Sequence, residues 1–69
     1  MNLYLVIAEK GEGSYGAYVP DLPGCVAVAK TRKAALKLVR EAIELHLESM
    51  REDGLPIPKP NSTSEYVQV

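Results

Sequence analysis

Two side chains of this 69-residue chain belong to types that often carry out covalent or metal chemistry, and each type occurs once. Cys25 has no second cysteine and no nearby histidine, so it lacks both the spacing of a zinc site and a base that would form a thiolate. His46 falls within the apolar arc of a predicted helix, with no neighbour that would complete a catalytic pair. We therefore interpret Cys25 as a buried small side chain and His46 as a core or interface residue, rather than as a nucleophile or a ligand.

Carboxylates recur along the same predicted helix, and they raise the question of a nuclease. Two-metal hydrolysis needs several clustered carboxylates, usually including one in the first strand of the sheet, to hold two ions about 4 Å apart. The first predicted strand has no acidic residue, and Glu41, Glu44 and Glu48 lie on the helix face opposite the apolar stripe. We therefore expect a solvated acidic surface with no catalytic residue, no metal site and no cofactor, so the sequence does not predict an enzyme.

Residues 19–25, with the sequence VPDLPGC, predict a rigid bend between two strands. Pro20 and Pro23 fix φ and withhold backbone donors. The carboxylate of Asp21 can close a turn, and Gly24 tolerates a positive φ. Turn chemistry accounts for each of these residue types, and binding of a partner is the alternative.

Short apolar runs on either side of this bend predict strands. The first covers residues 3–8, the second residues 15–19, the third residues 25–29 and the last residues 64–69. Since short loops join the first three, they form an antiparallel meander. With the helix described next, the predicted fold class is α+β and the element order is βββαβ.

One long helix is predicted from Thr31, whose hydroxyl can cap it, to about Glu52, ahead of a stop at Gly54. A stripe of apolar side chains at steps of three and four suits packing on one face of the sheet. This stripe consists of Leu36, Val39, Ile43, Leu47 and Met50.

The helix has more apolar surface than one sheet covers. Leu38 and Leu45 lie more than about 100° from the centre of the stripe, with Ala42 beside them. A second copy of the chain would cover this flank and give a homodimer or a higher homo-oligomer. A solvated surface is the alternative.

Charge along the helix runs against its macrodipole, which favours acidic residues at the start and basic residues at the end. Residues 30–40 contain five basic side chains and no acidic ones, whereas residues 41–53 contain five acidic side chains and one basic one. Intrahelical pairs such as Arg40 with Glu44 would compensate, as would two helices packed antiparallel about a two-fold axis. The basic residues, which are also candidates for nucleic-acid contact, are Lys30, Arg32, Lys33, Lys37 and Arg40.

Length and composition set the broad class of the protein. The 69 residues, 46% of them hydrophobic, form one small folded domain whose core is thin, which favours oligomerisation. A net charge of −1 gives no general attraction to phosphate, so direct DNA binding is not expected. With no leader, no membrane segment and one cysteine, we expect a cytoplasmic protein.

Three motifs occur in a fixed order: YVPDLPGC at 18–25, EAIELHL at 41–47 and GLPIP at 54–58. Together they resemble the N-terminal domain of HicB-like antitoxins over nearly the whole chain, which gives a single domain at 1–69. The resemblance implies a partial ribonuclease H-like fold, with the last strand parallel to the first. It also implies a non-enzymatic function, the binding and masking of a small, basic, mRNA-cleaving toxin of the HicA type.

The candidate toxin-binding residues are those of the bend and of the acidic half of the helix, namely Pro20, Asp21, Leu22, Pro23, Gly24, Glu41, Glu44 and Glu48. Typical full-length members continue into a DNA-binding module, whereas this chain stops at Val69, so we expect no such module and no operator repression. Where the family commonly has Gly-Asp-Thr, this chain has Ala29-Lys30-Thr31, which makes that rim basic. The alternative is an orphan oligomeric binding module that contacts nucleic acid through the basic half of its helix.

Overall fold

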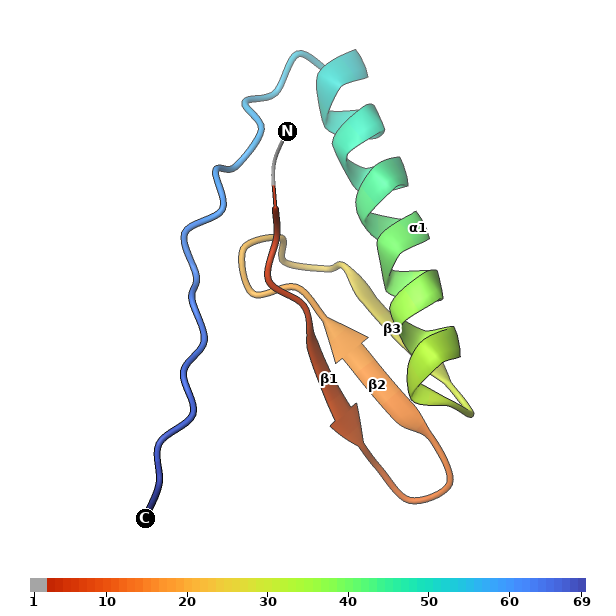
Figure 1. The fold of residues 1–69 in the computed structure, drawn as a ribbon. Coiled ribbons are helices and arrows are strands. Elements are labelled where there is room, and N and C mark those ends of the chain that lie inside the picture. The colour runs from red at the N-terminus through yellow and green to blue at the C-terminus, as the bar shows by residue number, and fades with distance from the viewer. Residues whose placement is uncertain (1–2) are drawn as a thin grey trace.

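The computed structural model describes residues 3–69. It contains strands β1 (Ile7–Lys10), β2 (Tyr15–Tyr18) and β3 (Val26–Ala29), followed by helix α1 (Arg32–Glu52). The strands form an antiparallel sheet in the order β1-β2-β3, and α1 packs on one face of it (Figure 1). The predicted α+β class, the three-stranded meander and the single long helix are confirmed.

The strand register separates a covered face of the sheet from an open one. Ala17 lies opposite Ala8 on one side and Ala27 on the other, and these small side chains let the helix approach closely. Tyr18 lies opposite Ile7 and Val26, so these three side chains share the other face. Since the only helix of residues 3–69 covers the first face, the second face is open.

A single small cluster of buried side chains joins sheet, bend and helix. Ala35 and Val39 of α1 are both fully buried and belong to the same core cluster as Ala17 of β2. A core of this size leaves a 69-residue domain with a narrow margin of stability. The buried residues are Ala17, Val19, Leu22, Cys25, Ala35 and Val39.

Both ends of α1 follow the predicted capping chemistry. The hydroxyl of Thr31 accepts a hydrogen bond from the backbone N–H of Ala34 at 3.1 Å, which satisfies one of the free donors of the first turn. At the other end, Gly54 adopts φ +69°, and the N–H of Leu55 donates to the carbonyl of Met50 at 2.9 Å. This arrangement is a Schellman motif, so the predicted stop at Gly54 is confirmed.

The first strand is shifted from its predicted position at residues 3–8. Ile7 pairs with Tyr18, the last residue of β2, and beyond that point the chain of β2 turns into the bend. Residues 3–6 therefore have no neighbouring strand to pair with. At the other end, the hairpin holds Glu9 and Lys10 in the ladder although both are charged.

Residues 55–69 contain no helix or strand, so the predicted strand at 64–69 is not formed. The segment runs past the β1 side of the sheet without joining it (Figure 1). Parallel pairing requires strands about 4.8 Å apart. Instead, a hollow of about 360 Å³ lies between residues 5–8 and residues 64–66. Val67 and Val69 are exposed.

Candidate functional site

The predicted bend is a closed loop between β2 and β3. The N–H of Val19 donates to the carbonyl of Cys25 at 3.2 Å, and the N–H of Cys25 donates to the carbonyl of Leu22 at 3.1 Å. Gly24 adopts φ +92°, a conformation that side chains with a Cβ rarely take. The loop is therefore held by its own backbone, as its prolines and glycine predict.

The residues of the bend divide between the core and the surface. Leu22 has 0% exposure, so its side chain is a core residue and does not reach a partner. Pro20, Pro23 and Gly24 are exposed and form the outer rim of the loop. Of the candidate toxin-binding residues in the bend, these three offer free surface.

Asp21 binds the carboxyl-terminal segment of its own chain. Its Oδ2 accepts hydrogen bonds from the backbone N–H groups of Asn61 at 3.1 Å and Ser62 at 3.0 Å. Its Oδ1 accepts a third from the hydroxyl of Ser62 at 2.9 Å. The backbone bond from Ser62, and after it the one from Asn61, holds the pKa of the Asp21 carboxyl below its usual range. Both carboxylate oxygens of Asp21 thus accept hydrogen bonds from within the chain.

A second contact fixes the same segment further upstream. The hydroxyl of Tyr4 donates to the backbone carbonyl of Pro58. Sequence patterns gave no signal for either attachment, because Tyr4 and Pro58 are 54 residues apart and no local period relates them. The stiff run of prolines at 56–60 is the one feature that indicates a directed return of the chain.

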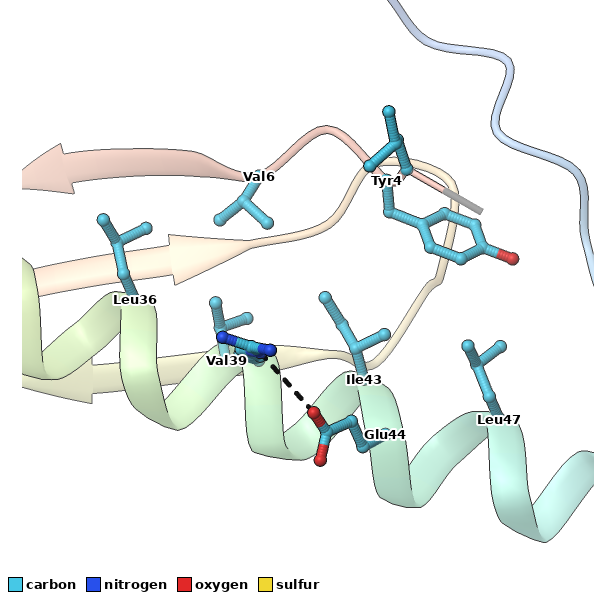
Figure 2. Close-up of a pocket in the computed structure, with 9 residues that line it drawn as sticks. Tyr4, Val6, Leu36, Val39, Ile43, Glu44 and Leu47 are labelled. Atoms are coloured by element: carbon cyan, nitrogen blue, oxygen red, sulfur yellow. Dashed lines mark ion pairs between the residues drawn. The ribbon is translucent and has the colours of Figure 1, made fainter. Parts of the chain in front are cut away.

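An apolar groove of about 510 Å³ lies between the amino-terminal segment and α1. Figure 2 shows Tyr4 and Val6 on one side of it and Leu36, Ile43 and Leu47 on the other. The ion pair between Arg40 and Glu44 closes part of its rim. The groove continues the core toward solvent, and most of the side chains that line it are apolar. It could accommodate an apolar group, but its lining does not suggest a catalytic site.

The acidic half of α1 is a solvent-facing surface. Glu41, Glu44 and Glu48 are all exposed, and they follow one another at steps of three and four along the outer side of the helix. Glu44 pairs with Arg40 at 3.5 Å, with the two side chains 67% and 82% exposed. Such an exposed pair adds little stability, so the carboxylates stay available to a partner.

The basic half of the helix and the turn before it are also exposed. Lys33, Lys37 and Arg40 lie within about 60° of one another around the helix, so they form one positive surface. The full set of exposed basic candidates is Lys30, Arg32, Lys33, Lys37 and Arg40.

The apolar flank predicted to contact a second copy is uncovered. Leu38 is 44% exposed and Leu45 is 68% exposed, while Ala42 between them is half-buried. The carboxyl-terminal segment passes on the opposite side of the molecule, so it does not shelter these leucines (Figure 1).

The two residue types with reactive side chains are placed as the sequence predicts. Cys25 is buried, with its Sγ 4.0 Å from the carbonyl oxygen of Ala42, and burial raises the pKa of its thiol. His46 is half-buried on α1. Within residues 3–69, no three His, Cys, Asp or Glu side chains gather closely enough to hold a metal ion. No helix of the described chain has the length and apolar character needed to cross a membrane.

Comparison with known proteins gives one family and several relatives. The profile of the HicB-like antitoxins of bacterial toxin–antitoxin systems matches residues 4–69. An uncharacterised protein from the rep–hol intergenic region of Haemophilus phage HP1 is 38% identical over 65 residues, which cover 94% of this chain and 49% of the relative. This chain therefore spans about half the length of that phage protein.

Two cellular relatives match over most of their own length. A UPF0150 protein of Thermoplasma acidophilum is 37% identical over 62 residues, which cover 90% of each chain. A UPF0150 protein of Helicobacter pylori is 39% identical over 64 residues, which cover 91% of this chain and 89% of the relative. No solved structure matches significantly.

Proposed function

Since the chain belongs to the HicB-like antitoxin family of bacterial toxin–antitoxin systems, we propose that it is a non-enzymatic antitoxin that binds and masks a small basic toxin of the HicA type. Toxins of that type cleave messenger RNA, so the encounter takes place in the cytoplasm. An inhibitor of such an enzyme has to occupy the positively charged surface that binds RNA. It therefore needs a rigid surface with negative charge.

The observation that most supports this proposal is the acidic outer face of α1. Glu41, Glu44 and Glu48 are exposed on one side of a helix whose opposite side is anchored in the core by Val39. The carboxylates are thus held on a rigid element, which lowers the entropy cost of binding. Negative charge at this surface also speeds the encounter with a basic protein.

The exposed rim of the bend supplies a second rigid contact. Pro20, Pro23 and Gly24 belong to a loop closed by backbone hydrogen bonds, so little order remains to be gained on binding. Asp21 acts here by tying the carboxyl-terminal segment to the loop, and the toxin meets the prolines rather than its carboxylate.

Isothermal titration of the chain with a purified HicA-type toxin from the same gene neighbourhood tests the proposal. The triple variant E41K/E44K/E48K should weaken binding about 100-fold, or about 2.7 kcal/mol. The control is K30E/K33E/K37E, which reverses the same number of charges in the basic half and should not weaken binding. In both triple variants the charges along the helix fit its macrodipole better than in the natural sequence. Neither variant should therefore destabilise the helix, and both should fold. Equal affinity of the acidic-half variant and the natural chain would contradict the proposal.

A second candidate function follows from the positive surface at Lys33, Lys37 and Arg40, all of which are exposed. A stand-alone module could bind RNA there through phosphate contacts. A gel-shift assay tests it: binding should fall with salt with a log–log slope of at most about 4, and K30E/K33E/K37E should abolish it. RNA binding that is unaffected by this variant would exclude the surface.

The apolar flank formed by Leu38, Ala42 and Leu45 is the candidate contact between copies of the chain. Two helices that meet antiparallel along it would set each basic half against an acidic half. Leu38→Glu and Leu45→Glu should each lower the mass measured by light scattering, and unchanged oligomers in both would contradict this contact.

A further inference from the structure

The outer edge of β3 lies on the same side of the molecule as the apolar flank of α1, and within residues 3–69 no strand pairs with this edge and the leucines of the flank are exposed. In Figure 1 the carboxyl-terminal segment follows the β1 side of the sheet, whereas β3 forms the other edge next to α1. We propose that two copies of this chain join β3 to β3 about a two-fold axis, which gives one six-stranded antiparallel sheet with both helices on the same face. The proposal rests on the helix contact proposed above and extends it.

The backbone of β3 directs free hydrogen-bonding groups toward this edge. The carbonyl of Cys25 accepts a bond from Val19, so this carbonyl points toward the β2 side. Hydrogen bonding alternates along an antiparallel strand. The N–H and C=O groups of Val26 and Val28 therefore point away from β2, and among residues 3–69 β3 pairs with β2 alone.

The sequence of β3 does nothing to prevent such pairing. Proteins usually protect an edge strand with a charge, a proline or a bulge. The four residues of β3 are Val-Ala-Val-Ala, in regular register with β2, and Val26 and Val28 are 64% and 68% exposed. The edge at β1 differs, because Glu9 and Lys10 lie in that strand.

Helical geometry places the exposed leucines above the free edge. Leu36 and Leu47 line the groove beside the amino-terminal segment, so that flank of α1 faces β1. At about 100° per residue, Leu45 lies about 180° from Leu36, and Leu38 lies about 180° from Leu47. Both exposed leucines thus face outward on the β3 side.

Known packing distances allow both contacts at once. Paired strands lie about 4.8 Å apart, so the two-fold axis passes about 2.4 Å beyond β3. Packed helices lie about 10 Å apart, so each helix axis lies about 5 Å from the two-fold and stands above the space between β2 and β3. The core agrees with this position, because Val39 of α1 and Ala17 of β2 belong to one buried cluster and Ala27 of β3 packs against that cluster.

The register of the pair follows from one contact between helix and strand. Ala42, midway between Leu38 and Leu45, has its carbonyl oxygen 4.0 Å from the Sγ of Cys25. The centre of the helix pair therefore lies above the first half of β3. A two-fold axis at Ala27 pairs Val26 with the partner's Val28, so the free groups of both valines are used. The antiparallel helices then place Lys30 near the partner's Asp53, which offsets the reversed charge of each helix.

Amide hydrogen exchange combined with sedimentation tests this proposal. The natural chain should sediment at about twice its 7.5 kDa mass, and the amide of Val26 should be protected in the dimer. V26K places two lysines diagonally across the two-fold on the same face of the sheet and should weaken the dimer about tenfold. The control V67K changes another exposed valine and should leave the dimer unchanged, with circular dichroism confirming that both variants fold.

Two results would overturn the proposal in distinguishable ways. A dimer whose Val26 amide exchanges as fast as that of Glu12 in the hairpin loop would exclude β3 pairing and leave the helix contact standing. A chain that stays monomeric at the highest concentration reached would exclude both contacts.

Discussion

Asp21 and Ser62 are joined by two hydrogen bonds, at 3.0 Å from the backbone N–H of Ser62 and at 2.9 Å from its hydroxyl, although they are 41 residues apart. The acid of the proline bend therefore anchors the carboxyl-terminal segment. This contact couples the shape of the bend, which we propose to meet the toxin, to the path of the chain after the helix.

Replacement of Asp21 by Asn should release the carboxyl-terminal segment while the sheet and helix stay folded. The amide side chain keeps one acceptor but loses the charge that strengthens all three bonds. Hydrogen exchange should show faster exchange at Asn61 and Ser62 and no change at Val39. The control E12Q removes a charge from the exposed hairpin loop. Unchanged exchange at Asn61 and Ser62 would contradict the anchoring role.

The same contact should respond to acid. The pKa of Asp21 is lowered in the folded chain, so its contribution to stability is complete above the unfolded value of about 3.9 and is lost as pH falls through the folded pKa. Carboxyl-carbon NMR should show Asp21 titrating below that value, and the Asn61 and Ser62 amide signals should shift with it. In D21N these amides should not respond to pH over that range. A normal or raised pKa would contradict the hydrogen bonds described.

The cap at Thr31 should contribute measurably to stability. T31A removes the hydroxyl that accepts the bond from Ala34, at a cost of about 1 kcal/mol. In a domain of this size the melting temperature should fall by about 4 to 8 °C. T63A, which changes a threonine beyond the helix, serves as the control and should melt with the natural chain. Equal melting of T31A and T63A would show that the cap is not formed.

Leu22 and Pro23 should behave oppositely although they are neighbours. L22A empties a fully buried site and should cost about 3 kcal/mol of unfolding free energy, as measured by urea denaturation. P23A changes an exposed residue and should leave stability nearly unchanged while it weakens toxin binding. The opposite result, in which folded L22A binds the toxin more weakly while P23A binds it as the natural chain does, would contradict a toxin contact at the exposed rim of the bend.

The parts of the fold that follow from local chemistry were predictable from the sequence. The helix was predicted within a residue of its ends because Thr31 and Gly54 cap it with their own side chain and backbone. The three strands and their faces followed from alternation around the bend. The start of β1 was not predictable, since its pairing partner, Tyr18, sets its position.

The carboxyl-terminal segment is where local patterns were insufficient. Residues 64–69 have the alternation of a strand, yet a strand requires an edge to pair with, and Asp21 holds the chain at Asn61 and Ser62 without bringing it to β1. Contacts over such separations leave no local period. For the same reason the sequence identified Asp21 as an exposed candidate, whereas the structure gives its carboxylate a partner within the chain.

Inhibition of RNA cleavage measures the central claim most directly. A HicA-type toxin from the same gene neighbourhood is incubated with a labelled messenger RNA while the natural chain or E41K/E44K/E48K is added in increasing amounts. We expect cleavage to stop near one natural chain per toxin and to continue with the variant at the same ratio. Undiminished cleavage at a large excess of the natural chain would contradict the proposal that this protein masks such a toxin.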